Sequence, residues 1–592
     1  MVGRSMLRHR WFFVAVVCLG IGLGLPSLKV GFVADDYTFI HRLEDPGQKA
    51  TLRLYELATG EPGQELRLMS ARWIAYPWWI ESGFKVRFLR PLSSAMFALD
   101  HALFGRAPLG YHADCLLWYA LLLVAVGLLL RSVCAPDAWQ LPFLLFALSA
   151  SHAESLAWIS SRHVLVSTVP ALFGLLALLE RENRGWRLGL PLGLVGMGLG
   201  LLGGEMALAV ACYWAAYCAF GPPVAKGARE RASRLALPLV GMAGYVVLYK
   251  ALGYGVAGSG AYLDPISTPG TFWPALPGRL AILFAELWAG LPANLSLNLL
   301  PWVGRALGVA TTAGVALLLR AIWPTLDAAE RCTLRWLSVG ALLAMSLNAG
   351  AYLGSRLLLI PGISAVVIIA TLLRHGWHAA RSRVGTLASR ALVAGLAFVH
   401  LGLAAVLLPL NCLLLAKIGA ASDAVQVSLA AHFREHRAQG ATPPRVFILA
   451  ASDPFTGFYG AAVQAVRAPN ATGQWSMLSM ARATHLIERT GASELTIHVE
   501  PSMLRSTFEG LFRPADLALA AGDTRVLPHG RVTVLSTAHG RPTAIRFTLT
   551  AGSLDDNDVC LLAWRDQHMV PVRLAPHQKL SIAWSPGPAG VL

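Results

Sequence analysis

Long apolar runs recur through the first 412 residues of this chain, and they restrict its fold more than any other feature. The runs lie at residues 11–33, 110–130, 141–157, 164–180, 188–203, 206–220, 235–252, 306–323, 336–353, 357–373 and 391–412. Each approaches the roughly 20 apolar residues that a helix needs to cross a bilayer. The sequence therefore predicts a polytopic α-helical membrane protein with about eleven transmembrane helices.

The composition agrees with a membrane protein and argues against a nucleic-acid partner. Of the 592 residues, 55% are hydrophobic and only 14% are charged, which lies outside the range of soluble globular proteins. The net charge of +16 comes from Lys and Arg clustered between the apolar runs, as in cytoplasmic loops. The eight cysteines form no CxxC or Cys/His metal motif. We therefore expect the lipid bilayer, and no nucleic acid, as a partner.

The basic loops also predict the topology. If the segment around Arg4, Arg8 and Arg10 is cytoplasmic, the basic stretches 181–187, 221–234, 327–335 and 374–383 are cytoplasmic too. A further candidate span at 281–303 would move the last two of these outside, so we interpret it as an interfacial or re-entrant segment. The loops 34–108 and 253–305 and the whole tail then face outward.

After residue 412 the apolar runs shorten to strand length. Runs typical of strands occupy 445–451, 494–500, 531–537, 544–550, 559–564 and 580–584, and 457–467 is typical of a helix. We predict two domains: a multi-span membrane domain at 1–412, and an extracytoplasmic, mainly β domain at 413–592 that binds the acceptor or caps the membrane site.

Two adjacent carboxylates, Asp35 and Asp36, directly follow the first apolar run. Two acids at a membrane boundary are costly unless they meet water, a cation or a substrate hydroxyl. A polar residue that ends the membrane span would explain one charge but not two. Lys or Arg would end the span at a lower free-energy cost, because their long side chains can reach the water by snorkelling. Both aspartates are therefore candidates for a catalytic base or for ligands of a divalent cation.

Further charges gather at the same predicted face. Arg87 and Arg90 precede an amphipathic stretch. They are equally suited to anchor the chain to lipid headgroups and to bind the phosphate of a ligand. Several ionisable groups at one membrane edge must satisfy one another or a ligand. Glu205 fits a buried structural ion pair at least as well as it fits a ligand site. The other charged candidates at this edge are His152, Glu154, Arg162 and Arg356.

Acids and arginines at a lipid boundary match the two needs of one reaction. A hydroxyl is a weak nucleophile near neutral pH, and a carboxylate that accepts its proton contributes roughly 10²–10⁴ in rate. A polyprenyl phosphate is already a good leaving group, so the other half of such a site needs cations near the phosphate. The residue types therefore favour transfer of a lipid-linked sugar.

The stretches VADDYTFI, FLRPLSSAMFALDHALFG, SHAESLAWISSRH, LLGGEMAL and SRLLLIPG resemble successive signatures of the polytopic GT-C glycosyltransferases. The resemblance covers residues 11 to 375 and is closest to the transmembrane O-mannosyltransferases that carry TPR repeats, and to related bacterial membrane proteins. It implies an enzyme, a hexosyltransferase, that moves a sugar from a polyprenyl-phosphate donor to a protein, glycan or lipid acceptor on the outer side of the membrane with inversion.

Carried onto matching positions, the resemblance implies that Asp35 or Asp36 is the general base, or a ligand in members that use Mg²⁺ or Mn²⁺. Arg90 and Arg356 would bind the lipid phosphate. The remaining residues would shape the donor pocket (His152, Glu154 and Arg162) or support the site (Arg87 and Glu205). The chain departs from the family in two ways: it has no TPR array after its spans, and it shows no additional D-x-D, which leaves metal dependence open.

Two other classes of function compete with a transferase. A transporter or flippase would place its polar groups near the midplane of broken helices, whereas here they gather at one edge. A membrane scaffold would leave the paired acids without a role. The composition, rich in Ala, Gly, Leu and Arg, suggests a bacterial inner membrane with the N-terminus inside and the C-terminal domain in the periplasm.

Overall fold

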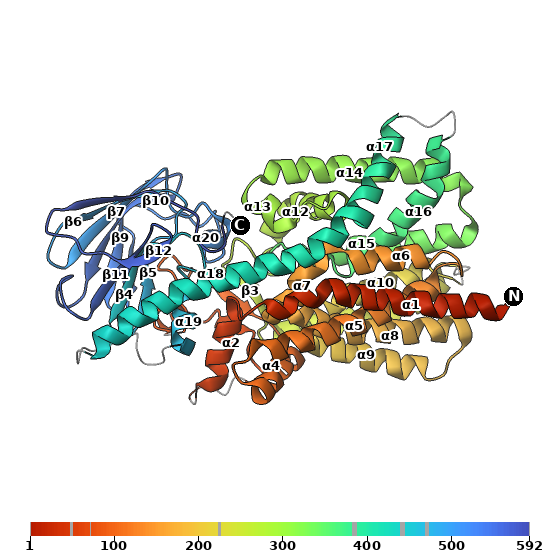
Figure 1. The fold of residues 1–592 in the computed structure, drawn as a ribbon, viewed down its shortest axis with the longest axis horizontal. Helices are drawn as coiled ribbons and strands as arrows, with labels where there is room; N and C mark the ends of the chain where they lie inside the picture. The colour runs from red at the N-terminus through yellow and green to blue at the C-terminus, as the bar shows by residue number, and fades with distance from the viewer. Residues whose placement is uncertain are drawn as a thin grey trace.

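The computed structural model describes residues 2–45, 47, 51–71, 73–222, 227–381, 387–438, 444–467 and 473–590. Along its long axis the molecule divides into a helical part and a β part, and one long helix, α18, extends from the first into the second (Figure 1). The predicted fold class, a polytopic helical protein with a C-terminal β domain, is confirmed.

Apolar helices build the membrane part. Among the described residues, six helices are long and apolar enough to cross a bilayer: Arg10–Lys29, Pro108–Val133, Ile159–Arg184, Ala228–Ala251, Pro301–Thr325 and Ser389–Glu435. The chain is therefore an integral membrane protein. Helices in this part are α1 (Val2–Gly24), α5 (Pro108–Val133), α6 (Gln140–Leu148), α7 (Ala153–Ala157), α8 (His163–Arg184), α9 (Gly189–Gly203), α10 (Ala207–Phe220), α11 (Ala228–Ala251), α12 (Pro269–Ala289), α13 (Ala293–Asn298), α14 (Pro301–Ile322), α15 (Ala328–Asn348), α16 (Pro361–Arg381), α17 (Leu387–Ala397) and α18 (Ala404–Ala438). The number of crossings, eleven, stays a prediction.

Two predicted spans differ from the observed helices. The run 141–157 is not one helix: α6 ends at Leu148, a 3-10 turn covers Ala150–His152, and α7 follows. The break lies where polar side chains interrupt the run, and Glu154 pairs with a residue of another segment. The run 391–412 continues through a π-helical turn, Phe398–Leu403, into α18. The predicted domain boundary after residue 412 therefore falls inside α18.

Segment 281–303 lies across the bundle. In Figure 1, α12 is seen almost end-on, whereas α1, α5 and α14 lie along the long axis. A Cβ at Gly308 of α14 would fall 1.7 Å from the carbonyl oxygen of Ala281, so glycine permits this close crossing. That this segment is interfacial or re-entrant stays a prediction.

A small sheet joins the two long predicted outer loops. Strands β1 (Glu56–Thr59), β2 (Lys85–Arg87) and β3 (Gly255–Ala257) form an antiparallel sheet, with Val86 opposite Val256. The first loop also carries helices α2 (Asp35–Glu44), α3 (Gln64–Met69) and α4 (Pro91–Phe104). The two loops therefore meet at one end of the helical part, the end that faces the β domain.

The C-terminal domain contains two sheets. A six-stranded antiparallel sheet has the order β13-β6-β7-β10-β9-β8, and a four-stranded sheet has the order β12-β11-β4-β5. Phe447 and Phe547 meet between them, with ring centroids 4.7 Å apart. All six predicted strands and the predicted helix are present. Their bounds, with the remaining elements, are β4 (Arg445–Ala450), α19 (Gly460–Arg467), β5 (Trp475–Met477), β6 (Thr484–Arg489), β7 (Glu494–Glu500), α20 (Thr507–Gly510), β8 (Thr524–Leu527), β9 (Gly530–Ala538), β10 (Arg541–Leu549), β11 (Val559–Arg565), β12 (His568–Pro571) and β13 (Lys579–Ile582).

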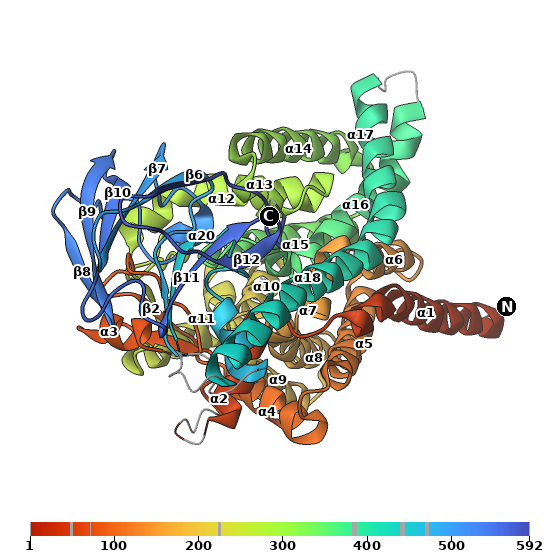
Figure 2. The same ribbon diagram turned by 60° about the vertical axis from the view of Figure 1, so that its left-hand side comes forward.

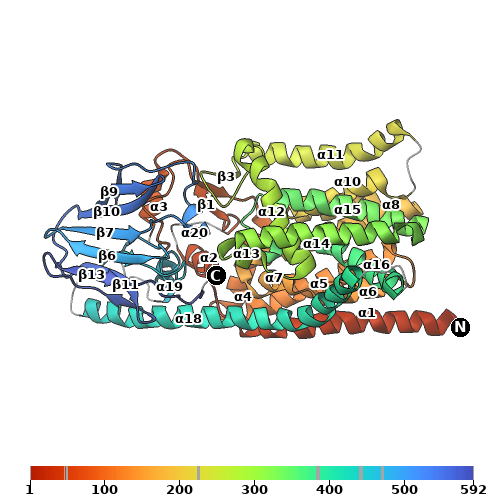
Figure 3. The same ribbon diagram turned by 90° about the horizontal axis from the view of Figure 1, so that it is seen from above.

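The β domain packs directly on the first outer loop. Figure 2 shows α3 beside β8, and Figure 3 shows α18 running along the same edge of the molecule as α1 before it reaches the sheets. Helix α19 packs against α2, which begins with the paired aspartates. The C-terminal domain therefore reaches the segment that the sequence singles out.

Candidate active site

Asp35 and Asp36 form the first turn of α2, at the end of the helical part that faces the β domain. Ala34, just before them, has φ 51° and ψ −115°, a conformation that residues with a Cβ rarely adopt. Such strain costs of order 1–3 kcal/mol and concentrates at functional sites. The chain therefore bends sharply where the two carboxylates begin.

Asp36 is fully buried and holds the site together. One carboxylate oxygen accepts the backbone N–H of Val33 at 2.9 Å, and the other accepts the backbone N–H of Ser160 at 2.8 Å together with the Ser160 hydroxyl. Burial raises the pKa of Asp36 to about 7, although these donors act in the opposite direction. With both oxygens occupied, Asp36 ties α2 to the turn before α8.

Asp35 is the more accessible of the two acids. Its carboxylate accepts a hydrogen bond from the hydroxyl of Tyr459 in the β domain and interacts electrostatically with Arg356. Burial raises the pKa of Asp35 to about 6, and the Tyr459 hydroxyl and the Arg356 charge oppose this rise. A carboxyl with a pKa near the working pH can both accept and release a proton.

Arg356 is paired with Glu154 beside Asp35. The guanidinium of Arg356 contacts one oxygen of Glu154, and its backbone N–H donates to the other at 3.1 Å. The guanidinium also donates to the carbonyl of Tyr352 at 3.0 Å. A Cβ at Gly354 would lie 2.7 Å from a Glu154 oxygen, so glycine lets this loop approach the carboxylate closely. The sequence-predicted residues Glu154 and Arg356 are thus brought together.

Arg90 forms a second arginine–glutamate pair. Its Nε donates to Glu205 at 2.9 Å, and the Tyr249 hydroxyl donates to the other Glu205 oxygen at 2.8 Å. The Arg90 guanidinium also lies over two aromatic rings, 5.0 Å from the centroid of Tyr55 and 4.2 Å from that of Phe88. The structural ion pair that the sequence allowed for Glu205 is therefore present, and Arg90 is its partner.

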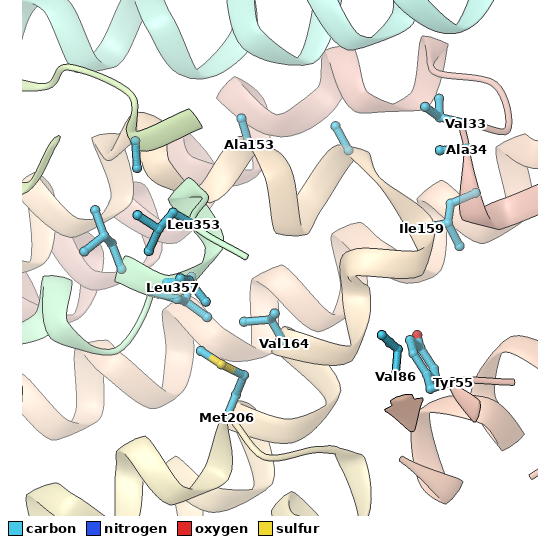
Figure 4. Close-up of a cluster of buried hydrophobic side chains, with 14 of the residues drawn as sticks. Val33, Ala34, Tyr55, Val86, Ala153, Ile159, Val164, Met206, Leu353 and Leu357 are labelled. Atoms are coloured by element: carbon cyan, nitrogen blue, oxygen red, sulfur yellow. The ribbon is translucent and has the colours of Figure 1, made fainter. Parts of the chain in front are cut away.

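Tyr262, from the second outer loop, connects these groups. It interacts electrostatically with Arg356, Arg90, Asp35 and Glu154, so all four lie around one side chain. Figure 4 shows a cluster of buried apolar side chains that come from separate segments. They include Val33, Ala34, Tyr55, Val86, Ala153, Ile159, Val164, Met206, Leu353 and Leu357. The segments that carry the two aspartates and Arg356 thus share a packed apolar cluster.

Three other predicted residues have separate partners. Arg162 is buried between Asp100 and Asp114, each 2.5 Å away, where it ties α8 to α4 and α5. His152 lies in an aromatic environment and contacts the Tyr119 hydroxyl at 3.2 Å. Arg87 donates to Glu56 at 2.8 Å. The structure therefore does not group His152, Glu154 and Arg162, although their sequence spacing is close.

Two cavities flank the turn that carries Arg356. The first, of about 60 Å³, lies among the helices and includes Ser355, Leu358, Val366 and Leu403 in a mainly aliphatic lining that also carries Glu286 and His400. The second, also of about 60 Å³, lies between the helices and the β domain, with Asn298 and Tyr352 on one side. Its β-domain side consists of Ser452, Asp453, Pro454, Met480, Arg482, Ser506 and Phe508. The turn that carries Arg356 thus adjoins two small cavities, one with mainly aliphatic and one with mainly polar lining residues.

The two aspartates alone do not fit a divalent-cation site. Within the described ranges, no group of three or more His, Cys, Asp or Glu side chains is placed to hold a metal ion. Mg²⁺ and Mn²⁺ prefer several oxygen ligands, whereas both oxygens of Asp36 already accept protein hydrogen bonds. The chemistry below therefore uses only side chains of this chain.

Several site residues escape sequence reasoning. Tyr459 and Tyr262 come from segments remote in sequence, and tyrosines at such places look like ordinary aromatic residues. Glu286, buried in α12 beside the apolar cavity, accepts the backbone N–H of Ala293 at 2.7 Å. A lone acid in the apolar stretch 281–303 was the one available signal.

Comparison with known proteins gives a likeness only at the level of structure. No protein-family model matches the sequence, and no curated protein is similar to it. The chain is similar to the oligosaccharyltransferase of Archaeoglobus fulgidus in its apo form, at a TM-score of 0.40 and 11% identity over 79% of this chain. A structure of that enzyme tethered to an acceptor peptide gives 0.35 and 12%, again over 79% of this chain, and a complex with Zn and sulfate gives 0.39 and 12% over the same share.

This chain spans less than two thirds of the length of that enzyme, 64% in the apo and peptide-tethered structures and 62% in the zinc complex. At these scores the likeness carries no argument, so the function proposed below rests on the side chains described above.

Proposed function

We propose that this protein is a membrane glycosyltransferase that moves a sugar from a polyprenyl-phosphate-linked donor to a hydroxyl of a protein or glycan acceptor. One observation carries the proposal: Asp35, a partly exposed carboxylate with a pKa near 6, lies beside the Arg356–Glu154 pair, and the turn that carries Arg356 adjoins one cavity lined mainly by aliphatic residues and one lined mainly by polar residues. A lipid-linked donor and a polar acceptor need such adjoining spaces.

The donor side of this site consists of cations and aliphatic surface. Arg356 adjoins the apolar cavity through its neighbour Ser355, so a polyprenyl chain in the cavity would bring its phosphate to the guanidinium. Arg90 also interacts electrostatically with Tyr262 and adds a second positive charge. Both arginines can bind a phosphate through two parallel hydrogen bonds.

In the reaction that we propose, the acceptor hydroxyl enters from the polar cavity and gives its proton to Asp35. Its oxygen forms a bond to the anomeric carbon from the face opposite the phosphate. The bond between that carbon and the phosphate oxygen breaks, and its electron pair stays on the phosphate beside Arg356. Attack from the opposite face inverts the anomeric configuration. Asp36 positions α2 and takes no part in the proton transfer.

The arrangement favours a transferase over a transporter. A transporter needs polar groups at the midplane of interrupted helices. Here the two arginine–glutamate pairs and Asp35 lie at the end of the helices that meets the β domain, and that domain supplies a hydroxyl to Asp35. We place this end outside the cytoplasmic membrane because the basic loops lie at the other end.

The test compares glycans from cells that lack the protein and carry wild type, Asp35→Asn or Asp36→Asn. We expect Asp35→Asn to accumulate as a folded protein and to give no glycan product. Asp36→Asn is the structural control, since it should reduce the amount of folded protein. If folded Asp35→Asn gives the normal glycan product, Asp35 is not the catalytic base. If cells that lack the protein still make all their glycans, the protein is not a glycosyltransferase.

A further inference from the structure

We propose that Tyr459 of the C-terminal domain is a positioning residue of the active site, which holds Asp35 in its ionised, correctly oriented form. This inference rests on the proposed function and goes beyond it. It makes the β domain a part of the catalytic site, with a task that is separate from binding the acceptor.

The turn that carries Tyr459 is rigid. Asp453 accepts the backbone N–H of Thr456 at 2.9 Å, and the Tyr459 N–H donates to the Pro454 carbonyl at 2.9 Å. Thr456 also donates its hydroxyl to the Asp453 carbonyl at 3.0 Å. The Tyr459 ring packs against Phe458, with centroids 5.0 Å apart. A tyrosine held in this way presents its hydroxyl in one direction.

The first outer loop is fastened to the same domain on both sides of Tyr459. The N–H of Ala75 donates to the carbonyl of Phe458 at 3.1 Å, one residue before Tyr459. The indole of Trp78 donates to the Leu478 carbonyl at 2.9 Å, and that of Trp79 donates to the Glu509 carbonyl at 3.1 Å. Both indoles are fully buried. The position of Tyr459 relative to α2 is therefore set by several independent bonds.

A second hydroxyl bridges the same interface without contacting Asp35. The hydroxyl of Tyr37, two residues after Asp35 in α2, donates to Asp423 of α18 at 2.5 Å. Arg467 of α19 also pairs with Asp423. Tyr37 thus links α2 to the C-terminal part as Tyr459 does, and it provides a matched control: Tyr37→Phe and Tyr459→Phe each remove one interface hydroxyl.

The Tyr459 hydroxyl acts on Asp35 together with other charges. Burial and the Asp35 charge raise the pKa of Tyr459, so its hydroxyl keeps its proton and remains a donor. Removing a donor from a carboxylate favours the protonated carboxyl. The titratable and charged groups around Asp35 are Asp36 of α2, Tyr55 and Tyr76 of the first outer loop, Tyr262 of the second, Arg356 with its partner Glu154, and Tyr459.

The test measures the protonation of Asp35 without any substrate. Dicyclohexylcarbodiimide, an apolar reagent, adds to protonated carboxyl groups, and mass spectrometry of the peptide locates the adduct on Asp35 or Asp36. Labelling of the full-length protein in detergent is followed against pH. We expect a midpoint near 6 for wild-type Asp35. Tyr459→Phe should move that midpoint upward by about one pH unit, the size expected for one hydrogen bond to a charged group.

Tyr37→Phe should leave the Asp35 midpoint in place, and Tyr459→Phe should also reduce the glycan product at pH 7 about twofold, because about half of Asp35 would then be protonated. An unchanged midpoint in Tyr459→Phe, or an equal shift in Tyr37→Phe, would overturn the positioning role and leave the proposed function standing. A shifted midpoint with full product would instead overturn the base role of Asp35 and, with it, any catalytic task for Tyr459.

Discussion

Replacing Asp35 by asparagine should remove activity and at the same time stabilise the protein. The pKa of Asp35 is about 6 in the folded protein, against an ordinary value of 3.8. The folded state therefore binds more protons than the unfolded state between pH 4 and 6, and stability decreases as the pH rises through that range. Above pH 6 the buried Asp35 charge lowers the stability of the wild-type protein by its full amount. The neutral amide of the Asp35→Asn variant has no charge to bury.

The size of the effect follows from the two pKa values. The difference between 6 and 3.8 corresponds to about 3 kcal/mol at pH 7 and above. Asp35 keeps some contact with solvent, which screens part of this energy, so we expect a gain of about 1–2 kcal/mol. The amide oxygen of asparagine can still accept the Tyr459 hydroxyl. In a protein of this size the gain amounts to roughly 1–2 °C in Tm.

The assay is thermal unfolding of the purified protein in detergent at pH 4.5 and pH 7.5, for wild type and Asp35→Asn. The stabilisation should be present in full at pH 7.5 and fall to about a third at pH 4.5, where Asp35 is neutral in the folded wild type but still largely ionised in the unfolded chain. A variant that is less stable than wild type at pH 7.5, or equally stabilised at both pH values, would refute the account of Asp35 as an acid held against its own burial.

Three further substitutions separate structure from catalysis. Asp36→Asn should lower stability by about 2 kcal/mol in thermal unfolding, because its amide N–H₂ would face the N–H of Val33; an unchanged Tm would contradict this. Arg162→Met leaves its two aspartate partners unpaired and should cost about 3–5 kcal/mol, seen as loss of the monodisperse peak in size-exclusion chromatography. Arg356→Gln should abolish the glycan product, and the double variant Glu154→Gln/Arg356→Gln should recover folded protein without recovering product; recovered product would refute phosphate binding by Arg356.

Local sequence patterns predicted the elements well. Residue periodicity and length gave strand β7 with both ends correct and β11 to within one residue. Strand β8, Thr524–Leu527, was missed because its four residues carry no alternation long enough to recognise. The run 141–157 was wrongly predicted to be one helix, because its mean hydropathy is that of a membrane span. A few polar residues near its end have partners in other segments and break the helix.

The site was only half predictable for a related reason. Asp35, Arg90 and Arg356 stand out because charge at a membrane boundary is costly. Which partner satisfies each of them depends on contacts between distant segments, as for Glu154 with Arg356 across about 200 positions. Sequence neighbours such as Glu154 and Arg162 were grouped because they are adjacent in the chain, and the helical turns between them direct their side chains to different partners.

The paired arginines explain how the site can be folded before a donor arrives. An unpaired guanidinium in a largely buried place would be destabilising, and Glu154 and Glu205 neutralise Arg356 and Arg90 in the structure. Each glutamate occupies only part of the guanidinium, since Arg356 also donates to a carbonyl and Arg90 faces two rings. A phosphate that binds the same arginines gains hydrogen bonds without having to expel the glutamates. The pairs thus hold the cations in place at a modest cost in affinity, which suits the proposed reaction, in which the donor leaves as a free lipid phosphate after each transfer.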